Sequence, residues 1–231
     1  MNTTSAFSPS AQRPARRPQL GPPLWAPILA YAILTVIGVI ANRSTPHPDA
    51  SGSAVLAYDT SHMTAVKVGS WLLFISAVPL SIFSAVIYRR LRALGITAPG
   101  SAIALVAGVL AASALMSSGI FAWSSAQLTA DAPPALARVL ANVSFLVGGP
   151  AYAVMVALLI SGIAVPALLS RLLPRPMLWG GFVLAATGLV STVTMLSLGF
   201  DVLLPIVRFG GLIWLIALAF LLPDTRHSSA A

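Results

Sequence analysis

The sequence contains no cysteine and no glutamate, and it is poor in charge of either sign. Only 8% of its 231 residues are charged, whereas soluble globular proteins carry about 25%. The absence of cysteine excludes disulfide scaffolds, thiolate metal sites and thiol–disulfide electron carriers. The shortage of charge excludes a soluble core under a polar surface, because hydrophobic residues make up 58% of the chain. Most of the chain is therefore expected to lie in lipid.

Long apolar segments predict the fold. A membrane-spanning helix needs roughly 20 mostly apolar residues, and six segments meet this requirement: 24–41, 68–88, 101–126, 139–165, 177–198 and 202–222. We expect an all-α polytopic membrane protein, with six transmembrane helices in one bundle over residues 24–222. The proline-rich residues 1–23 predict a disordered basic tail in the cytoplasm, and residues 223–231 predict a short cytoplasmic tail. The first span could instead be a cleaved signal sequence, but its length favours a retained anchor.

The basic residues predict the orientation, because Lys and Arg are retained on the cytoplasmic side of a membrane. With both termini inside, nine of the 13 basic residues lie in the cytoplasm. The four on the outer side are Arg43, Lys67, Arg138 and Arg208. The net charge of +8 therefore indicates membrane topology and not nucleic-acid binding. The expected partners are membrane lipids, whose anionic headgroups would meet the cytoplasmic Arg clusters; a second copy of the chain or another membrane protein is an open alternative.

The segment 101–126 is rich in small residues, including Gly108 and Ala112 at a spacing of four. Small residues let helix backbones approach closely, which drives helix association in lipid. We therefore expect this helix to lie at the centre of the bundle, and Gly108→Leu or Ala112→Leu to overpack it. The alternative is a wall of small residues that lines a pore.

Charged residues recur on the outer side with a near-constant period. Asp59 and Lys67, Asp131 and Arg138, and Asp201 and Arg208 each pair an acid with a base seven or eight residues later. This pattern is compatible with three helical hairpins. The simpler interpretation makes each Asp a helix N-cap and lets each base reach back to the interface. The sharper hypothesis is an outer ring of ion pairs between helices.

Arg208 is the most informative of these charges, because it follows Pro205 and is expected within the apolar region. A charge at that depth indicates a functional or structural partner. We expect Asp201, Asp131 or Asp59 to pair with it, with Asn142 as a further polar neighbour. Removal of Arg208 would then leave a buried carboxylate unpaired, at a cost of about 3–5 kcal/mol.

The remaining polar residues offer little catalytic chemistry. His47, His62 and His227 all lie outside the expected spans, so no haem, metal or other cofactor is expected. Ser118 has no histidine within the membrane to activate it, and we expect it to bond the carbonyl four residues before it. Asp59, His62 and Lys67 form the densest polar group, in the long outer segment. A solvated loop with an N-cap near Asp59 is the simplest interpretation, since two ligands are too few to specify a metal.

Three stretches carry a resemblance to known sequences: 88–95 (YRRLRALG), 148–150 (GGP) and 204–211 (LPIVRFGG). With them, the chain resembles uncharacterised bacterial six-span integral membrane proteins. The resemblance implies a location in the bacterial inner membrane. It implies no activity and no site residues.

Three functions remain open. The first is a non-catalytic protein that binds a small apolar or amphipathic ligand, a lipid or a partner subunit, in a cavity opened by helices interrupted at Pro79 and Pro150. The second is a transporter or channel in which Arg208 and Arg138 select an anion. The third is a lipid-modifying enzyme that uses Asp59, His62 or Asp131. Outer charges gathered around one cleft would favour the second or third function, whereas charges dispersed at the lipid edge would favour the first.

Overall fold

The computed structural model describes residues 22–223, and this part of the chain contains helices and no strand. The expected tails at 1–23 and 223–231 fall almost entirely outside the described residues. The all-α fold class is confirmed.

The helices follow one another with short connections. The N-terminal half consists of α1 (Trp25–Ala41), α2 (Gly52–Ser61), α3 (Met63–Ala93) and α4 (Gly100–Ser125). A long interrupted helix follows, built from α5 (Pro134–Leu146), the π-helical turn η1 (Val147–Ala151) and α6 (Tyr152–Leu169). The chain ends in α7 (Arg175–Val190) with the 3-10 turn η2 (Ser191–Met195), and then η3 (Leu198–Phe200), α8 (Leu203–Pro205), the π-helical turn η4 (Ile206–Gly210) and α9 (Gly211–Leu221).

Five of these helical stretches are long and apolar enough to cross a membrane. They are Met63–Ala93, Gly100–Ser125, Pro134–Leu169, Arg175–Met195 and Leu198–Leu221. The remaining apolar helix, α1, has 17 residues and is shorter than the others. The predicted segments are found at these places, although α3 and the α5–α6 helix extend beyond the predicted ends by about one turn.

The segment 42–67 is not the solvated loop that we expected, because it contains α2. Ser51 caps this helix by accepting a hydrogen bond from the amide of Ala54 at 3.2 Å. Val55 and Leu56 are buried against Ala137 of α5. A helix of ten residues is marginal by itself, so its packing on α5 stabilises it.

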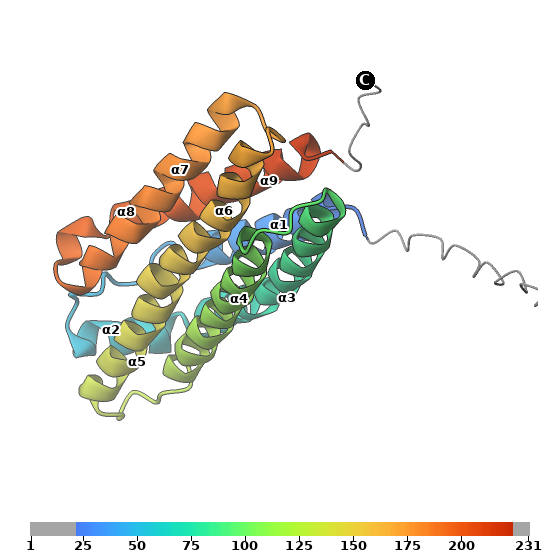
Figure 1. Ribbon diagram of the computed structural model, residues 1–231. Coiled ribbons are helices and arrows are strands. Elements are labelled where there is room, and N and C mark those ends of the chain that lie inside the picture. The colour runs from blue at the N-terminus through green and yellow to red at the C-terminus, as the bar shows by residue number, and fades with distance from the viewer. Residues whose placement is uncertain (1–21, 224–231) are drawn as a thin grey trace, which may run out of the picture.

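The long helices run side by side, and α2 crosses one end of them (Figure 1). We call this the α2 end. The two ends of the described chain lie together at the opposite end (Figure 1). Pro23, Leu24, Arg90, Leu222 and Pro223 border one small pocket there. We call this the terminal end.

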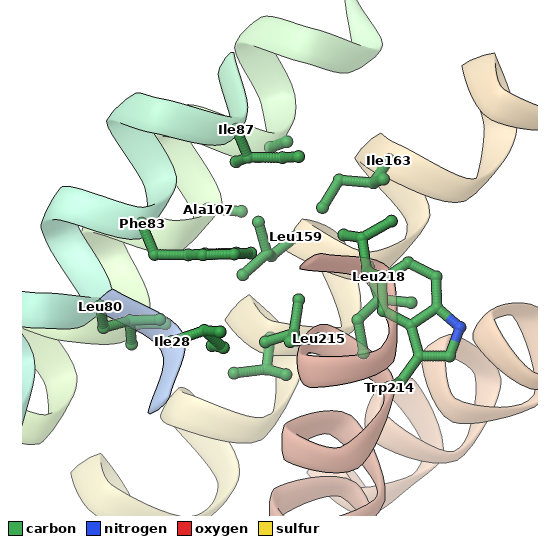
Figure 2. Close-up of a cluster of buried hydrophobic side chains, with 14 of the residues drawn as sticks. Ile28, Leu80, Phe83, Ile87, Ala107, Leu159, Ile163, Trp214, Leu215 and Leu218 are labelled. Carbon is green, nitrogen blue, oxygen red and sulfur yellow. The ribbon is translucent and has the colours of Figure 1, made fainter. Parts of the chain in front are cut away.

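The main hydrophobic core fills the middle of the bundle (Figure 2). Ile28 of α1, Phe83 of α3, Leu159 of α6 and Leu215 of α9 are almost fully buried within it. Trp214 of α9 belongs to this core and is 4% exposed. Its indole N–H donates to the carbonyl of Met177 at 2.8 Å, which ties α9 to α7.

The α5–α6 helix is the most deeply buried of the long helices, so the expectation that α4 lies at the centre of the bundle is wrong. Helix α4 has an exposed face, on which Val106 is 56% and Ile120 is 50% exposed. It packs against α3, α5 and α6. A Cβ atom placed on Gly108 would lie 2.0 Å from the Oγ of Ser84 on α3, so no larger residue fits there without movement of α3. Close packing explains the small residues of this helix.

Two of the helices are interrupted. One interruption is at Pro150, as expected, but the other is not at Pro79. Pro79 lies inside α3, which continues through it as an unbroken α-helix. Pro150 lies inside η1, and Pro205 directly precedes η4. A proline lacks the N–H that an α-helix needs, and single π-helical turns are frequent at functional sites. The interruptions therefore occur in the α5–α6 helix and in the last helix.

Candidate functional site

A cavity of about 470 Å³ lies at the α2 end of the bundle. Residues from α1 to α6, α8, η1 and η4 line it, together with the loop 42–50. Most of the lining is apolar and includes Val39, Val55, Leu73, Phe145 and Leu204. The polar side chains in the lining are Asn42, Thr45, His47, Asp59, Ser118, Ser125, Arg138, Asn142, Ser144, Tyr152, Asp201 and Arg208.

Five of the eight residues in the predicted outer charge network line this cavity. They are Asp59, Arg138, Asn142, Asp201 and Arg208. The charges are therefore gathered around one cleft, although they come from three separate segments of the chain, namely α2, α5 and the last helix.

The other three predicted residues lie outside the cavity lining. His62 is exposed at the junction of α2 and α3, where its ring stacks on Tyr58 with centroids 4.5 Å apart. Asp131 is exposed in the turn before α5, and Lys67 lies in the first turns of α3. Of the three residues that a lipid-modifying enzyme was expected to use, only Asp59 lines the cavity.

Arg208 enters the cavity from η4, and two contacts fix its guanidinium. Its Nη2 donates a hydrogen bond to the carbonyl of Gly148 in η1. Its Cζ lies 5.1 Å from the centroid of the Tyr152 ring, a distance typical of a cation–π contact. The two π-helical turns therefore meet through this side chain.

The geometry of η1 provides the acceptor. The amide of Tyr152 donates to the carbonyls of Val147, five residues back, and of Gly149, and not to that of Gly148. The π-helical turn thus directs the amide of Tyr152 away from the carbonyl that an α-helix would use. Arg208 bonds this carbonyl of Gly148 instead.

The expectation that Arg208 pairs with an acid is wrong. Within residues 22–223, the ion pairs closer than 4.0 Å join His47 to Asp49 and His47 to Asp201, and Arg208 is in neither. A backbone carbonyl and an aromatic ring hold Arg208 in place without neutralising its charge. Because Arg208 has no acidic partner, its removal would leave no carboxylate unpaired. The cost expected for an unpaired carboxylate therefore no longer applies.

Tyr152 is itself held by a buried hydrogen bond. Its hydroxyl bonds the hydroxyl of Tyr31 on α1, and both side chains are at most 2% exposed. The ring beneath Arg208 is therefore fixed by α1. A rigid support of this kind orients a charged side chain before a ligand arrives.

Asp59 is buried in the same cavity and is not a helix N-cap. It lies inside α2, is 5% exposed, and accepts a hydrogen bond from the hydroxyl of Ser125 at the end of α4. Burial raises the pKa of Asp59 above its ordinary value, and the hydrogen bond from Ser125 opposes this shift. Asp131 and Asp201 also precede their helices without capping them, since Pro133 and Val202 occupy those positions.

His47 forms the rim of the cavity. Its side chain is 55% exposed, and its two ring nitrogens bond Asp49 and Asp201, each at 2.7 Å. The hydrogen bonds to Asp49 and to Asp201 raise the pKa of His47 above its ordinary value. The protonated ring therefore links the loop 42–50 to the start of the last helix. Deprotonation at higher pH removes the ionic part of this link.

Two serines join α4 to α5 at the cavity wall. Ser118 donates to the carbonyl of Ser144 at 2.9 Å, and Ser144 donates to the carbonyl of Ser118 at 3.0 Å. The expectation that Ser118 bonds a carbonyl within its own helix is wrong. The small neighbour Gly148 explains the difference, because Ser118 packs against the position that a Cβ atom there would fill.

Sequence reasoning missed His47 and Tyr152 as site residues. His47 was noted only as a residue outside the spans, and its partner Asp201 lies 154 residues away. Tyr152 follows Pro150 by two residues, so the proline was a usable signal for the interruption beside it. Nothing in the sequence indicates that Tyr152 meets Tyr31.

The arrangement can bind an anion. A guanidinium has five N–H donors in a planar fork, and Gly148 uses one donor of Arg208. Planar oxyanions such as carboxylates match that fork. Arg138 adds a second positive charge to the lining, and it has no ion pair in the part of the chain that the structure describes.

Comparison with known proteins adds no relative: no family model, no curated protein and no solved structure matches the chain.

Proposed function

We propose that this protein binds a small amphipathic anion in the cavity at the α2 end. The observation that carries the proposal is the unneutralised guanidinium of Arg208, which lines the cavity and is held there by Gly148 and Tyr152. An uncompensated charge among apolar groups is costly. A bound anion would supply the missing negative charge.

The cavity walls favour an anion with an apolar part. Val39, Leu73 and Phe145 lie in the same lining as Arg208, and small-molecule sites are mostly apolar with a few polar groups that fix orientation. The volume of about 470 Å³ falls in the usual range of roughly 300–1,000 Å³ for such sites. A short alkyl chain with a carboxylate, sulfonate or phosphate headgroup fits this description.

A transporter of the same anion is the second candidate. The interrupted helices at η1 and η4 support it, because discontinuous helices flank the substrate sites of many transporters. The gathering of Asp59, Arg138, Asp201 and Arg208 at one cavity supports an anion site over a protein whose charges only face lipid. Uptake of an alkyl sulfonate into proteoliposomes, compared with protein-free liposomes, distinguishes a carrier from a receptor.

We also propose six membrane spans, with α1 as the first, and a bacterial inner-membrane location with both termini in the cytoplasm. The unequal distribution of basic residues supports this orientation, and the resemblance to bacterial six-span proteins stays a prediction. In this topology the α2 end faces outward. The Arg-rich stretches near Arg90 and Arg171 would then meet anionic headgroups at the cytoplasmic surface, and a second copy or another membrane subunit remains a candidate partner.

The orientation predicts which residues a reagent outside the cell can reach. Because the chain has no cysteine, Ser51→Cys introduces a single thiol, at an exposed position before α2. An impermeant maleimide is expected to label it in intact cells. Ala98→Cys, at an exposed position in the loop between α3 and α4, is the matched control and should be labelled only after lysis. The opposite pattern would reverse the topology.

The binding proposal predicts that the protein selects its ligand by the negative charge of the headgroup and not by the alkyl chain alone. In phosphatidylcholine nanodiscs, calorimetry should detect binding of octanesulfonate and octanoate beyond their partition into empty nanodiscs. Octanol and octyltrimethylammonium carry the same alkyl chain without negative charge and should show no such excess. Equal binding of all four probes would contradict an anion site. Loss of octanesulfonate binding when phosphatidylglycerol is added would identify a lipid headgroup as the natural anion.

A further inference from the structure

Asp59 is the one buried carboxylate within residues 22–223, since Asp49 and Asp131 are exposed and Asp201 is partly exposed. It lines the cavity that holds Arg208 and Arg138. The described residues give it a single hydrogen-bond partner, the hydroxyl of Ser125. This carboxylate neither caps a helix nor joins an ion pair, and its one hydrogen bond ties α2 to the end of α4.

The elements around Asp59 carry several other charged or titratable groups. Helix α4 brings only Ser125, because it has no ionisable residue. The remaining groups are Arg43, His47 and Asp49 in the loop 42–50, Tyr58 on α2, His62 and Lys67 at the start of α3, Arg138 on α5, and Asp201 and Arg208 on the last helix. In the part of the chain that the structure describes, no basic group among them lies within ion-pair distance of Asp59.

We propose that the cavity takes up its anion together with a proton, and that Asp59 is the group that accepts this proton. The inference rests on the anion binding proposed above. An ionised Asp59 and a bound anion would place two negative charges in one small, mostly apolar cavity. Protonation of the carboxylate by solvent removes this repulsion and leaves the positive charges of Arg208 and Arg138 to the anion.

The direction of the coupling follows from linkage. Burial by the protein already raises the pKa of Asp59, and a bound anion raises it further. Between the two pKa values, anion binding draws a proton from solution. The anion therefore binds more tightly as pH falls through this range, by up to about tenfold per pH unit for one coupled proton.

The test measures binding and proton uptake together. The full chain in phosphatidylcholine nanodiscs is titrated with octanesulfonate, which stays ionised at every pH used, in weakly buffered solution from about pH 5 to pH 8. A pH electrode records proton uptake, and calorimetry records the affinity. We expect wild-type protein to take up as much as one proton per anion, and its affinity to rise as pH falls.

Four variants test which group accepts the proton. Asp59→Asn should bind octanesulfonate with an affinity that no longer rises at low pH. It should also lose the proton uptake that we assign to Asp59. Asp131→Asn is the matched control, because it makes the same exchange at an exposed acid outside the cavity, and it should behave as wild type. His47→Gln removes the titratable group at the rim and should retain uptake. Ser125→Ala removes a hydrogen bond to the carboxylate, so the pH range of uptake should move upward.

The outcomes separate this inference from the proposed function. If wild-type protein binds no octanesulfonate at any pH, the anion site itself is wrong. If it binds with the same affinity from about pH 5 to pH 8 and takes up no proton, the anion site stands and the coupling is overturned. Unchanged uptake in Asp59→Asn, or complete loss of uptake in His47→Gln, also overturns the assignment. Should Asp59→Asn fail to fold, the upward shift in Ser125→Ala decides the question.

Discussion

Replacement of Arg208 by glutamine is expected to weaken octanesulfonate binding more than any other single change in the cavity. Removal of one partner of a desolvated charge pair costs about 2–5 kcal/mol, which is roughly a 30-fold to several-thousand-fold loss of affinity. We expect this large effect because the position of Arg208 is fixed: Gly148 and Tyr152 hold it in the cavity lining before the anion binds. Calorimetry in phosphatidylcholine nanodiscs measures the change.

Two matched variants make this result specific. Arg138→Gln removes the second guanidinium of the lining, and a smaller loss is expected because Arg138 is exposed to solvent. Lys67→Gln removes a positive charge at the same end of the bundle but outside the lining, and wild-type affinity is expected. If Arg208→Gln binds octanesulfonate as tightly as Lys67→Gln does, Arg208 is not the anion-binding group.

The same substitution should affect stability less than an ion-pair mutant would. The partner of Arg208 is a carbonyl, so its removal leaves no buried carboxylate behind. The loss of one charge-assisted hydrogen bond is partly offset by removal of an uncompensated charge. We therefore expect the free energy of unfolding to fall by less than the ~3–5 kcal/mol typical of a broken buried pair. A selective loss of binding in a folded variant would separate function from folding.

Gly162→Ala is expected to lower the stability of the protein strongly. A Cβ atom at Gly162 would lie 2.8 Å from the amide nitrogen of Ala104 and 2.9 Å from the carbonyl oxygen of Gly100. Both atoms belong to the backbone of α4, which cannot rotate away as a side chain does. Overpacking of this kind costs about 1–3 kcal/mol or more. Thermal unfolding in one detergent should show a lower Tm than wild type.

Gly180→Ala provides the control for this prediction. Gly180 lies in α7, where the nearest atom to an added Cβ is the Cδ1 of Trp214 at 3.9 Å. Alanine is a better helix former than glycine by roughly 1 kcal/mol. The two variants make the same exchange in two helices, and their Tm values should move in opposite directions. A rise in Tm for both would show that α4 and α6 are not in close contact at Gly162.

The positions of the long helices along the chain were largely predictable because their signals are local. The apolar segments, the small residues near Gly108 and the prolines at 150 and 205 are visible along the chain, and lipid imposes helix on any apolar segment of that length. Helix α2 was missed because its stability comes from a contact between Val55, Leu56 and Ala137. Residues so far apart leave no common pattern in the sequence.

The sequence by itself determined that this protein is helical, apolar and free of thiol chemistry, and it marked Asp59, Arg138, Asp201 and Arg208 as unusual charges in a chain that has few. Only the tertiary structure decided what surrounds them. Arg208 bonds a carbonyl 60 residues away, and every residue has a carbonyl, so no residue type could have indicated this partner. The contacts of Asp59 with Ser125 and of His47 with Asp201 likewise depend on how the helices pack. Composition and hydropathy fix which segments enter the membrane, whereas the partners of a charge depend on packing between distant segments.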